Sequence, residues 1–187
     1  MSPLPVRLVG DPVLRERAVE ITDFRTDDHA RECAALMATL EDFRARQGFG
    51  RAIAAPQVGC SRRMIALNLG EGPFVICNPV IVQRSERRFT MWDDCMSFPW
   101  LLVRVERHES VSVEYFTEDG QPRCWDDLDR ATSELLQHEI DHLDGVLALD
   151  RAVGDDPIVA REAFEADPER HARRVDYLIE AATGDGR

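Results

Sequence analysis

Residues 135–145 read Leu-Leu-Gln-His-Glu-Ile-Asp-His-Leu-Asp-Gly, and the rest of the chain is arranged around them. Apolar residues and histidines recur at steps of three and four from Leu128 onward, which predicts a helix that stops at Gly145. In a helix, His138 and His142 lie one above the other on the same face, because side chains four positions apart stack along the axis. Two imidazoles in this position can bind one metal ion.

Glu139 follows the first of these histidines directly. Its carboxylate can reach a water molecule on a metal without being a ligand, which is the arrangement in His-Glu-x-x-His hydrolases. The alternative is an ordinary amphipathic helix with two half-buried histidines that have hydrogen-bond partners.

Composition and charge restrict the class of protein. The chain has 187 residues, 44% hydrophobic and 31% charged, which predicts one globular domain. No apolar run is long enough for a membrane span, and the N-terminus has no secretory pattern, so we expect a cytoplasmic protein. A net charge of −12 argues against direct nucleic-acid binding. The chain contains no lysine, which excludes Schiff-base chemistry and a P-loop lysine.

The third metal ligand is the open question. A catalytic metal site needs about three protein ligands and one open position. Five cysteines without a Cys-x-x-Cys pair indicate neither a disulfide framework nor a zinc ribbon. Cys95 is favoured as a ligand because it follows two aspartates in a short segment between predicted strands. Composition alone does not choose it over Cys60 or Cys77.

The remaining elements predict an α+β fold, because strand patterns fill the middle of the chain and helical patterns its ends. Strands are predicted at residues 64–68, 74–78, 80–82, 101–105 and 111–116, with 122–125 as a hairpin partner. Helices are predicted from Asp11 to about Ala18, from Asp27 to Arg46 with Thr26 or Asp27 as cap, over 157–164 and over 169–182. A disordered tail is predicted for 183–187.

Three segments together resemble the peptide deformylase family in order and spacing. That family carries Gly-x-Gly-x-Ala-Ala-Pro-Gln, Glu-Gly-Cys-Leu-Ser and Gln-His-Glu-x-Asp-His. Residues 50–57 (Gly-Arg-Ala-Ile-Ala-Ala-Pro-Gln) are similar to the first motif, 93–97 (Asp-Asp-Cys-Met-Ser) to the second, and 137–142 match the third. Residues 10–15 (Gly-Asp-Pro-Val-Leu-Arg) also resemble the family's opening, so the likeness runs from about Val6 to Leu149.

The resemblance implies a set of roles. Cys95, His138 and His142 would bind the metal, which in the family is Fe(II), with Zn(II), Ni(II) or Co(II) as substitutes that the same ligands suit. Glu139 would act as general base and acid on the metal-bound water, while Gln57 and the Met96 N–H would hold the developing oxyanion. The implied fold packs antiparallel strands around a metal-binding helix. The implied reaction removes the N-formyl group from formyl-methionine of nascent proteins.

The chain departs from the family at several positions. Ala52 replaces a glycine beside which the substrate chain would lie, and Asp93-Asp94 replace Glu-Gly. We expect Asp93 to support the metal site, paired with Arg104 or Arg107. Glu134 stands where the family lines its methionine pocket with an apolar residue. If this carboxylate points inward, a basic or polar N-formyl substrate becomes plausible; if it points outward, methionine fits.

The sequence therefore predicts a single catalytic domain over residues 1–187, with a motif-bearing core of about 6–150 and a helical C-terminal extension of about 157–182. Its partner would be an N-formylated peptide or nascent chain. The C-terminal extension is more acidic than basic, which argues against docking to the ribosome. Two alternatives stay open: a related hydrolase of another N-formyl or N-acyl compound, and a non-catalytic metalloprotein with a fourth ligand from Glu134, Asp94 or another cysteine.

Overall fold

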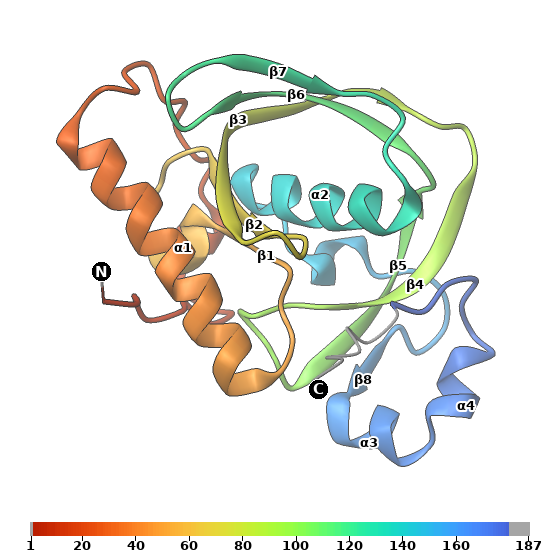
Figure 1. Ribbon diagram of the computed structural model, residues 1–187. Helices are drawn as coiled ribbons and strands as arrows, with labels where there is room; N and C mark the ends of the chain where they lie inside the picture. The colour runs from red at the N-terminus through yellow and green to blue at the C-terminus, as the bar shows by residue number, and fades with distance from the viewer. Residues whose placement is uncertain (1, 180–187) are drawn as a thin grey trace.

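The metal-binding helix predicted from the sequence, α2 (Arg130–Leu143), lies in the middle of two antiparallel sheets (Figure 1). The structure is a computed structural model and describes residues 2–179. The predicted α+β class is confirmed, with sheets that curve around a central helix.

The larger sheet has five strands in the order β1-β2-β3-β6-β7, and every neighbouring pair is antiparallel. Its strands are β1 (Ala52–Ala54), β2 (Met64–Asn68), β3 (Pro73–Arg84), β6 (Val111–Thr117) and β7 (Pro122–Trp125). The smaller sheet has the order β4-β5-β8, with β4 (Arg88–Asp94), β5 (Leu101–His108) and β8 (Ile158–Ala160). Short 3-10 helices are η1 (Pro12–Arg15), η2 (Ala55–Val58) and η3 (Ala148–Arg151).

Alternation along β2 places the large sheet between two helices. Ile65 and Leu67 pack in the same apolar cluster as Leu136 and Leu143 of α2. The intervening residues of β2 face a second cluster, formed with helix α1 (Asp27–Gln47). Successive side chains of a strand point to opposite faces, so one strand supports both helices. Each fully buried leucine stabilises this packing by about 2 kcal/mol.

Local capping fixes both helices. Thr26 accepts a hydrogen bond from the His29 N–H at 3.1 Å, and Asp129 accepts one from the Thr132 N–H at 2.9 Å. Beyond α2, Gly145 has φ +74°, and a Cβ there would lie 2.6 Å from the backbone oxygen of Arg15. Glycine is therefore required both for the left-handed conformation and for the close approach of the N-terminal segment.

Most predicted elements are confirmed, and the errors lie at the two ends of the chain and at three strands between them. The predicted helix from Asp11 is only the single turn η1. Strands at 74–78 and 80–82 form one long strand with register shifts, while β1 and β4 were not predicted. The missed β4 contains Asp93 and Asp94 at its end, so the segment expected between strands begins only after it.

The C-terminal prediction is wrong in detail. Residues 158–160 form a strand because they pair with the free edge of β5, and only then do α3 (Arg161–Ala166) and α4 (Pro168–Ala172) follow. The helix expected over 169–182 ends at Ala172, because the next segment pairs with β4. There the Asp176 carboxylate accepts a hydrogen bond from the Thr90 N–H at 2.9 Å, and Tyr177 bridges Met91. Residues 180–182 and the predicted tail lie outside the described residues.

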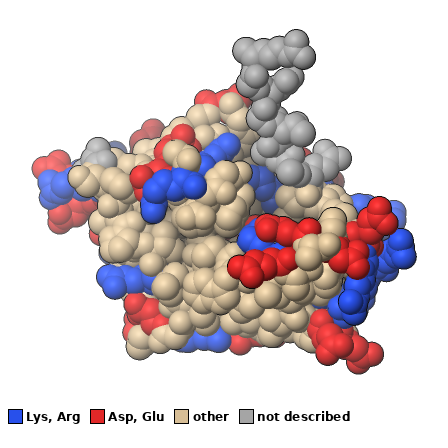
Figure 2. All heavy atoms as spheres, turned by 90° about the horizontal axis from the view of Figure 1, so that it is seen from below, with Lys and Arg blue, Asp and Glu red and all other residues tan. Residues whose placement is uncertain are grey.

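The surface carries both signs of charge. In Figure 2, acidic and basic side chains are interspersed over the face shown, between areas of uncharged residues. Within residues 2–179, no helix has the length and apolar character needed to cross a membrane.

Candidate active site

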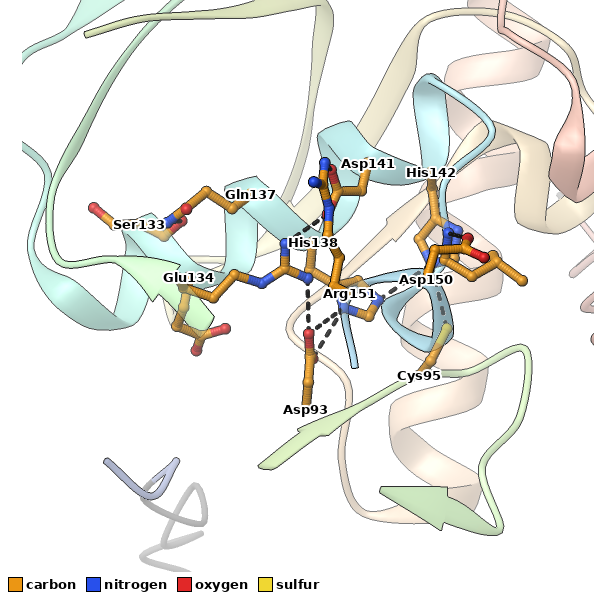
Figure 3. Close-up of polar contacts among 12 residues, drawn as sticks. Asp93, Cys95, Ser133, Glu134, Gln137, His138, Asp141, His142, Asp150 and Arg151 are labelled. Carbon is orange, nitrogen blue, oxygen red and sulfur yellow. Dashed lines mark hydrogen bonds and ion pairs between the residues drawn. The ribbon is translucent and has the colours of Figure 1, made fainter. Parts of the chain in front are cut away.

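Three potential metal ligands meet beneath α2. His138 and His142 approach each other with their Nε2 atoms 3.2 Å apart, and the Cys95 Sγ lies 3.2 Å from the His142 Nε2. Cys95 comes from the end of β4, so its position depends on how the smaller sheet packs under the helix (Figure 3). All three side chains are buried.

Asp93 orients the first histidine. Its carboxylate lies 2.9 Å from the His138 Nδ1 (Figure 3). Arg107 binds the same carboxylate at 2.9 Å. Burial opposes ionisation of Asp93, but His138 and Arg107 outweigh it and hold the pKa of this carboxyl far below its usual value. The ionised Asp93 accepts a hydrogen bond from the His138 Nδ1–H, which turns Nε2 towards Cys95. Burial opposes protonation of His138, but Asp93 and Cys95 outweigh it and hold the pKa of His138 well above its usual value, so a metal ion bound at Nε2 would displace a proton. Of the two arginines expected as partners, Arg107 is therefore the correct one.

The donor set fits a divalent transition metal. The ligand atoms of Cys95, His138 and His142 all lie within 4.8 Å of one another. Burial and the neighbouring His138 hold the pKa of His142 well below its ordinary value, so its imidazole is neutral and able to coordinate. One thiolate and two imidazoles are typical ligands for iron, cobalt, nickel and zinc, and three ligands leave a coordination position open.

Glu139 lies beside this group with unused hydrogen-bonding capacity. The side chain is buried, and its Oε2 has no hydrogen-bond partner among the described residues. Burial raises the pKa of Glu139 to about 7, against an opposing effect of His138. A carboxyl group with such a pKa can both accept and release a proton near neutral pH.

Gln57 is held on the other side of Cys95. Its Oε1 accepts a hydrogen bond from the Ala54 N–H at 2.9 Å, which fixes the orientation of the amide. Its Nε2 consequently faces the site and donates to the Ser97 Oγ at 3.2 Å and to the Cys95 Sγ at 3.5 Å. The 3-10 helix η2 positions this side chain with a donor aimed at the metal ligands.

A cavity of about 350 Å³ opens beside these groups. Seven of the eight site residues expected from the sequence line it, and the eighth, His142, contacts two of them. The seven are Ala52, Gln57, Cys95, Met96, Glu134, His138 and Glu139. The rest of the lining is mainly apolar or aromatic and includes Phe49, Trp92, Leu102, Phe164 and Leu178.

Glu134 points inward. It leaves α2 on the side where Asp93 and Cys95 lie, and only 2% of it is exposed (Figure 3). Arg51, which the sequence reasoning did not identify, pairs with it. Burial raises the pKa of Glu134 to about 7, and Arg51 opposes this rise. The available signal was an arginine inside an otherwise small and apolar segment, residues 50–56.

Known proteins are similar to this chain in both sequence and fold. The family described as polypeptide deformylase matches residues 3–157. A peptide deformylase of Thermotoga sp. (strain RQ2) is 36% identical over 146 residues, which cover 78% of this chain and 85% of the relative. The crystal structure of peptide deformylase from Thermotoga maritima has a TM-score of 0.75 at 32% identity and covers 82% of this chain and 100% of that one. A peptide deformylase from Synechococcus elongatus in complex with actinonin has a TM-score of 0.73 at 31% identity, with coverage of 91% and 87%.

Proposed function

Because the chain belongs to the polypeptide deformylase family, we propose that Cys95, His138 and His142 bind its divalent metal ion and that Glu139 transfers protons during hydrolysis. The enzyme is a metal-dependent peptide deformylase, which hydrolyses the N-formyl amide of formylated nascent chains to formate and a free amino terminus. The observation that carries the assignment of residues is the convergence of three buried donor atoms next to the unpartnered Glu139 Oε2.

The chemistry divides between the ion and the protein. When bound, a divalent ion acts as a Lewis acid and lowers the pKa of water towards neutrality. The Glu139 carboxylate would accept a proton from the attacking water as the water oxygen bonds to the formyl carbon, and would deliver it to the amine nitrogen as the C–N bond breaks. Asp93 keeps the His138 ring in the tautomer that coordinates, through the contact at Nδ1.

Gln57 and Met96 stabilise the charge that develops on the formyl oxygen. The Gln57 Nε2 already faces the ligand group, and Met96 lines the cavity immediately after Cys95. We assign the Gln57 amide and the Met96 backbone N–H as donors to this oxygen. Each donor of this kind typically lowers the barrier by about 3 kcal/mol.

We propose Fe(II) as the metal in the cell. The support is the family resemblance together with a ligand set of one thiolate and two imidazoles, which binds ferrous iron as well as zinc, nickel or cobalt. The anionic thiolate partly compensates the charge of the ion within a buried site. We also propose a cytoplasmic location, since formylated chains emerge from the ribosome there.

The structure offers no support for the non-catalytic alternative. Two of the candidate fourth ligands are engaged elsewhere, because Glu134 pairs with Arg51 and Asp94 pairs with Arg161 at 3.1 Å. A basic substrate is not favoured either, since the inward carboxylate of Glu134 is already compensated. We therefore propose formyl-methionine as the preferred first residue, in a cavity with mainly apolar walls.

The test is formate release from formyl-Met-Ala by protein loaded anaerobically with Fe(II), with the Glu139→Ala variant as blank. We expect turnover that disappears in the blank, and inhibition by actinonin, the ligand of the Synechococcus elongatus relative. Glu114→Gln, an exposed glutamate on β6 outside the cavity lining, is the matched control and retains full activity. Absence of formate from protein with one bound metal per chain would contradict the proposal.

A further inference from the structure

An ion pair forms part of the cavity wall next to the reacting groups. Glu134 lies one helical turn before His138 on α2, and Arg51 precedes β1 on the opposite side. Both line the cavity and their side chains pair directly. Residues four apart on a helix are separated by roughly 6 Å along its axis, which is about the reach of a methionine or lysine side chain.

Arg51 is fixed to α2 at two points. Besides pairing with Glu134, its Nη1 donates to the backbone oxygen of Ala131 at 2.9 Å, one turn earlier in the helix. A guanidinium has five N–H donors, so two contacts leave donors available. About 27% of the Arg51 side chain is exposed, against 2% of Glu134. Each partner would therefore present a strong charge to the cavity if the other were absent.

Apart from Glu139, the proposed proton carrier, the other acidic and basic groups of the lining are tied to different partners. Asp93 is bound by Arg107 and His138, while Asp94 pairs with Arg161. Arg161 also donates to the Pro99 oxygen at 2.6 Å and lies 4.6 Å from the ring centroid of Phe49. Arg51 and Glu134 thus form a pair of their own, and the charges of the guanidinium and the carboxylate cancel. Within residues 2–179, neither side chain forms a hydrogen bond with any of the three proposed metal ligands.

We propose that the Arg51–Glu134 pair is the specificity determinant that restricts this deformylase to substrates with an uncharged first side chain. The inference rests on the proposed function, since it assumes that the substrate's first residue enters this cavity. Mutual neutralisation removes the attraction that either charge would exert, while the buried pair repels no apolar or thioether group. A charged substrate side chain would lose its hydration without gaining an uncompensated partner.

The proposal predicts opposite changes for the two partners. In Arg51→Met, Glu134 loses its compensation and selects a basic side chain. In Glu134→Gln, Arg51 is released and selects an acidic one. The double variant Arg51→Met/Glu134→Gln has neither charge and returns to uncharged substrates.

The experiment measures kcat/KM at pH 8 for formyl-Met-Ala, formyl-Lys-Ala and formyl-Glu-Ala, using Fe(II)-loaded protein. Relative to formyl-Met, we expect formyl-Lys to gain roughly tenfold or more in Arg51→Met and formyl-Glu to gain similarly in Glu134→Gln. These gains should appear in KM more than in kcat, because the pair does not touch the reacting atoms. Arg88→Ala, which removes an exposed ion pair between Arg88 on β4 and Glu106 on β5, is the control and leaves both ratios unchanged.

Equal ratios in all variants, or a shift in the same direction for both single variants, would overturn the proposal and leave the pair a purely structural role. If Arg51→Met does not fold, Glu134→Gln and the double variant decide, since neither contains an unpaired buried carboxylate. Inactivity of the wild type on formyl-Met would instead refute the proposed function, so the two failures are distinguishable.

Discussion

Glu134 and Glu139 lie five positions apart on α2, and comparison of their surroundings separates two regions of the cavity. Both carboxyl groups are buried, and burial raises the pKa of each to about 7. Glu134 is compensated by Arg51 from the opposite wall, whereas the Glu139 Oε2 has no partner in residues 2–179. The same residue type at the same depth therefore forms part of the cavity wall in one region, while in the other it is free to act as the proton carrier that we propose.

The largest effect should separate the two glutamates by rate. In Glu139→Gln the carboxylate that carries the proton is lost, and we expect kcat for formyl-Met-Ala to fall about 10³-fold. Glu134→Gln should lose far less of kcat, because its side chain does not reach the reacting atoms. Steady-state kinetics of both variants checks this, with metal content measured to show that each site is loaded. Equal losses in the two variants would remove the distinction between the regions.

Replacement of the Cys95 thiolate should lower both the metal content and the activity. Cys95→Ser replaces the soft anionic donor with a weaker one, so we expect less than one metal per chain after gel filtration and at least about 10²-fold lower activity. Cys124→Ser is the matched control, since Cys124 is exposed on β7. Metal analysis and formate release measure both. Full occupancy and activity in Cys95→Ser would exclude Cys95 as a ligand.

Loss of the Asp93 carboxylate, which contacts His138, should have a smaller effect on the metal site. Asp93→Asn removes the negative charge that Arg107 and His138 share, and we expect about 10- to 100-fold weaker metal binding. Competition with a chromogenic chelator measures this affinity. Asp94→Asn, the neighbouring residue whose carboxylate pairs with Arg161, should leave the affinity unchanged. Equal weakening in both variants would point to disturbance of β4 rather than loss of the Asp93 contact.

The smallest effect concerns the free energy of unfolding, which the burial of Glu134 in the cavity wall makes dependent on pH. The folded pKa of Glu134, about 7, exceeds its ordinary value of 4.5, so between these values the folded state keeps a proton that the unfolded state has released. This group's contribution to stability is therefore largest below pH 4.5 and declines as the pH rises to 7. Relative to Glu134→Gln, the wild type should lose roughly 3 kcal/mol between pH 4.5 and 8. Urea unfolding of both proteins at several pH values measures the difference, and a constant difference would contradict it.

Sequence alone was sufficient where local geometry decides. The spacing of His138 and His142 forces them onto one face of a helix, and the motif around Cys95, by its resemblance to the family, predicted the cysteine that the structure places next to them. Helix α1 and strands β2, β5 and β6 follow from periodicity, because each has one or both faces in an apolar core. Strand β7 is largely exposed and follows instead from the turn at residues 118–120, which predicts a hairpin. Periodicity and motif spacing are local features, so they can be interpreted without knowing which distant segments pack against them.

Errors arose where an element depends on a remote partner. The C-terminal segment has a helical pattern, yet residues 158–160 and 176–177 pair with β5 and β4, because strand edges with unsatisfied N–H and C=O groups lie next to them. The pattern of apolar residues within the C-terminal segment cannot show that an unpaired strand edge lies next to it in the folded protein.

The sequence alone identified the family and the candidate site residues, which are the proposed metal ligands and the proposed proton carrier Glu139, because short motifs carry them and the spacing of these motifs fixes their local geometry. Only the tertiary structure decided that Glu134 points inward and that its charge is compensated by Arg51, which is 83 residues away in the chain. A cationic partner offsets part of the cost of burying this carboxylate, and which distant cation reaches it depends on how β1 packs against α2. The spacing of residues along α2 cannot show which distant side chain pairs with Glu134.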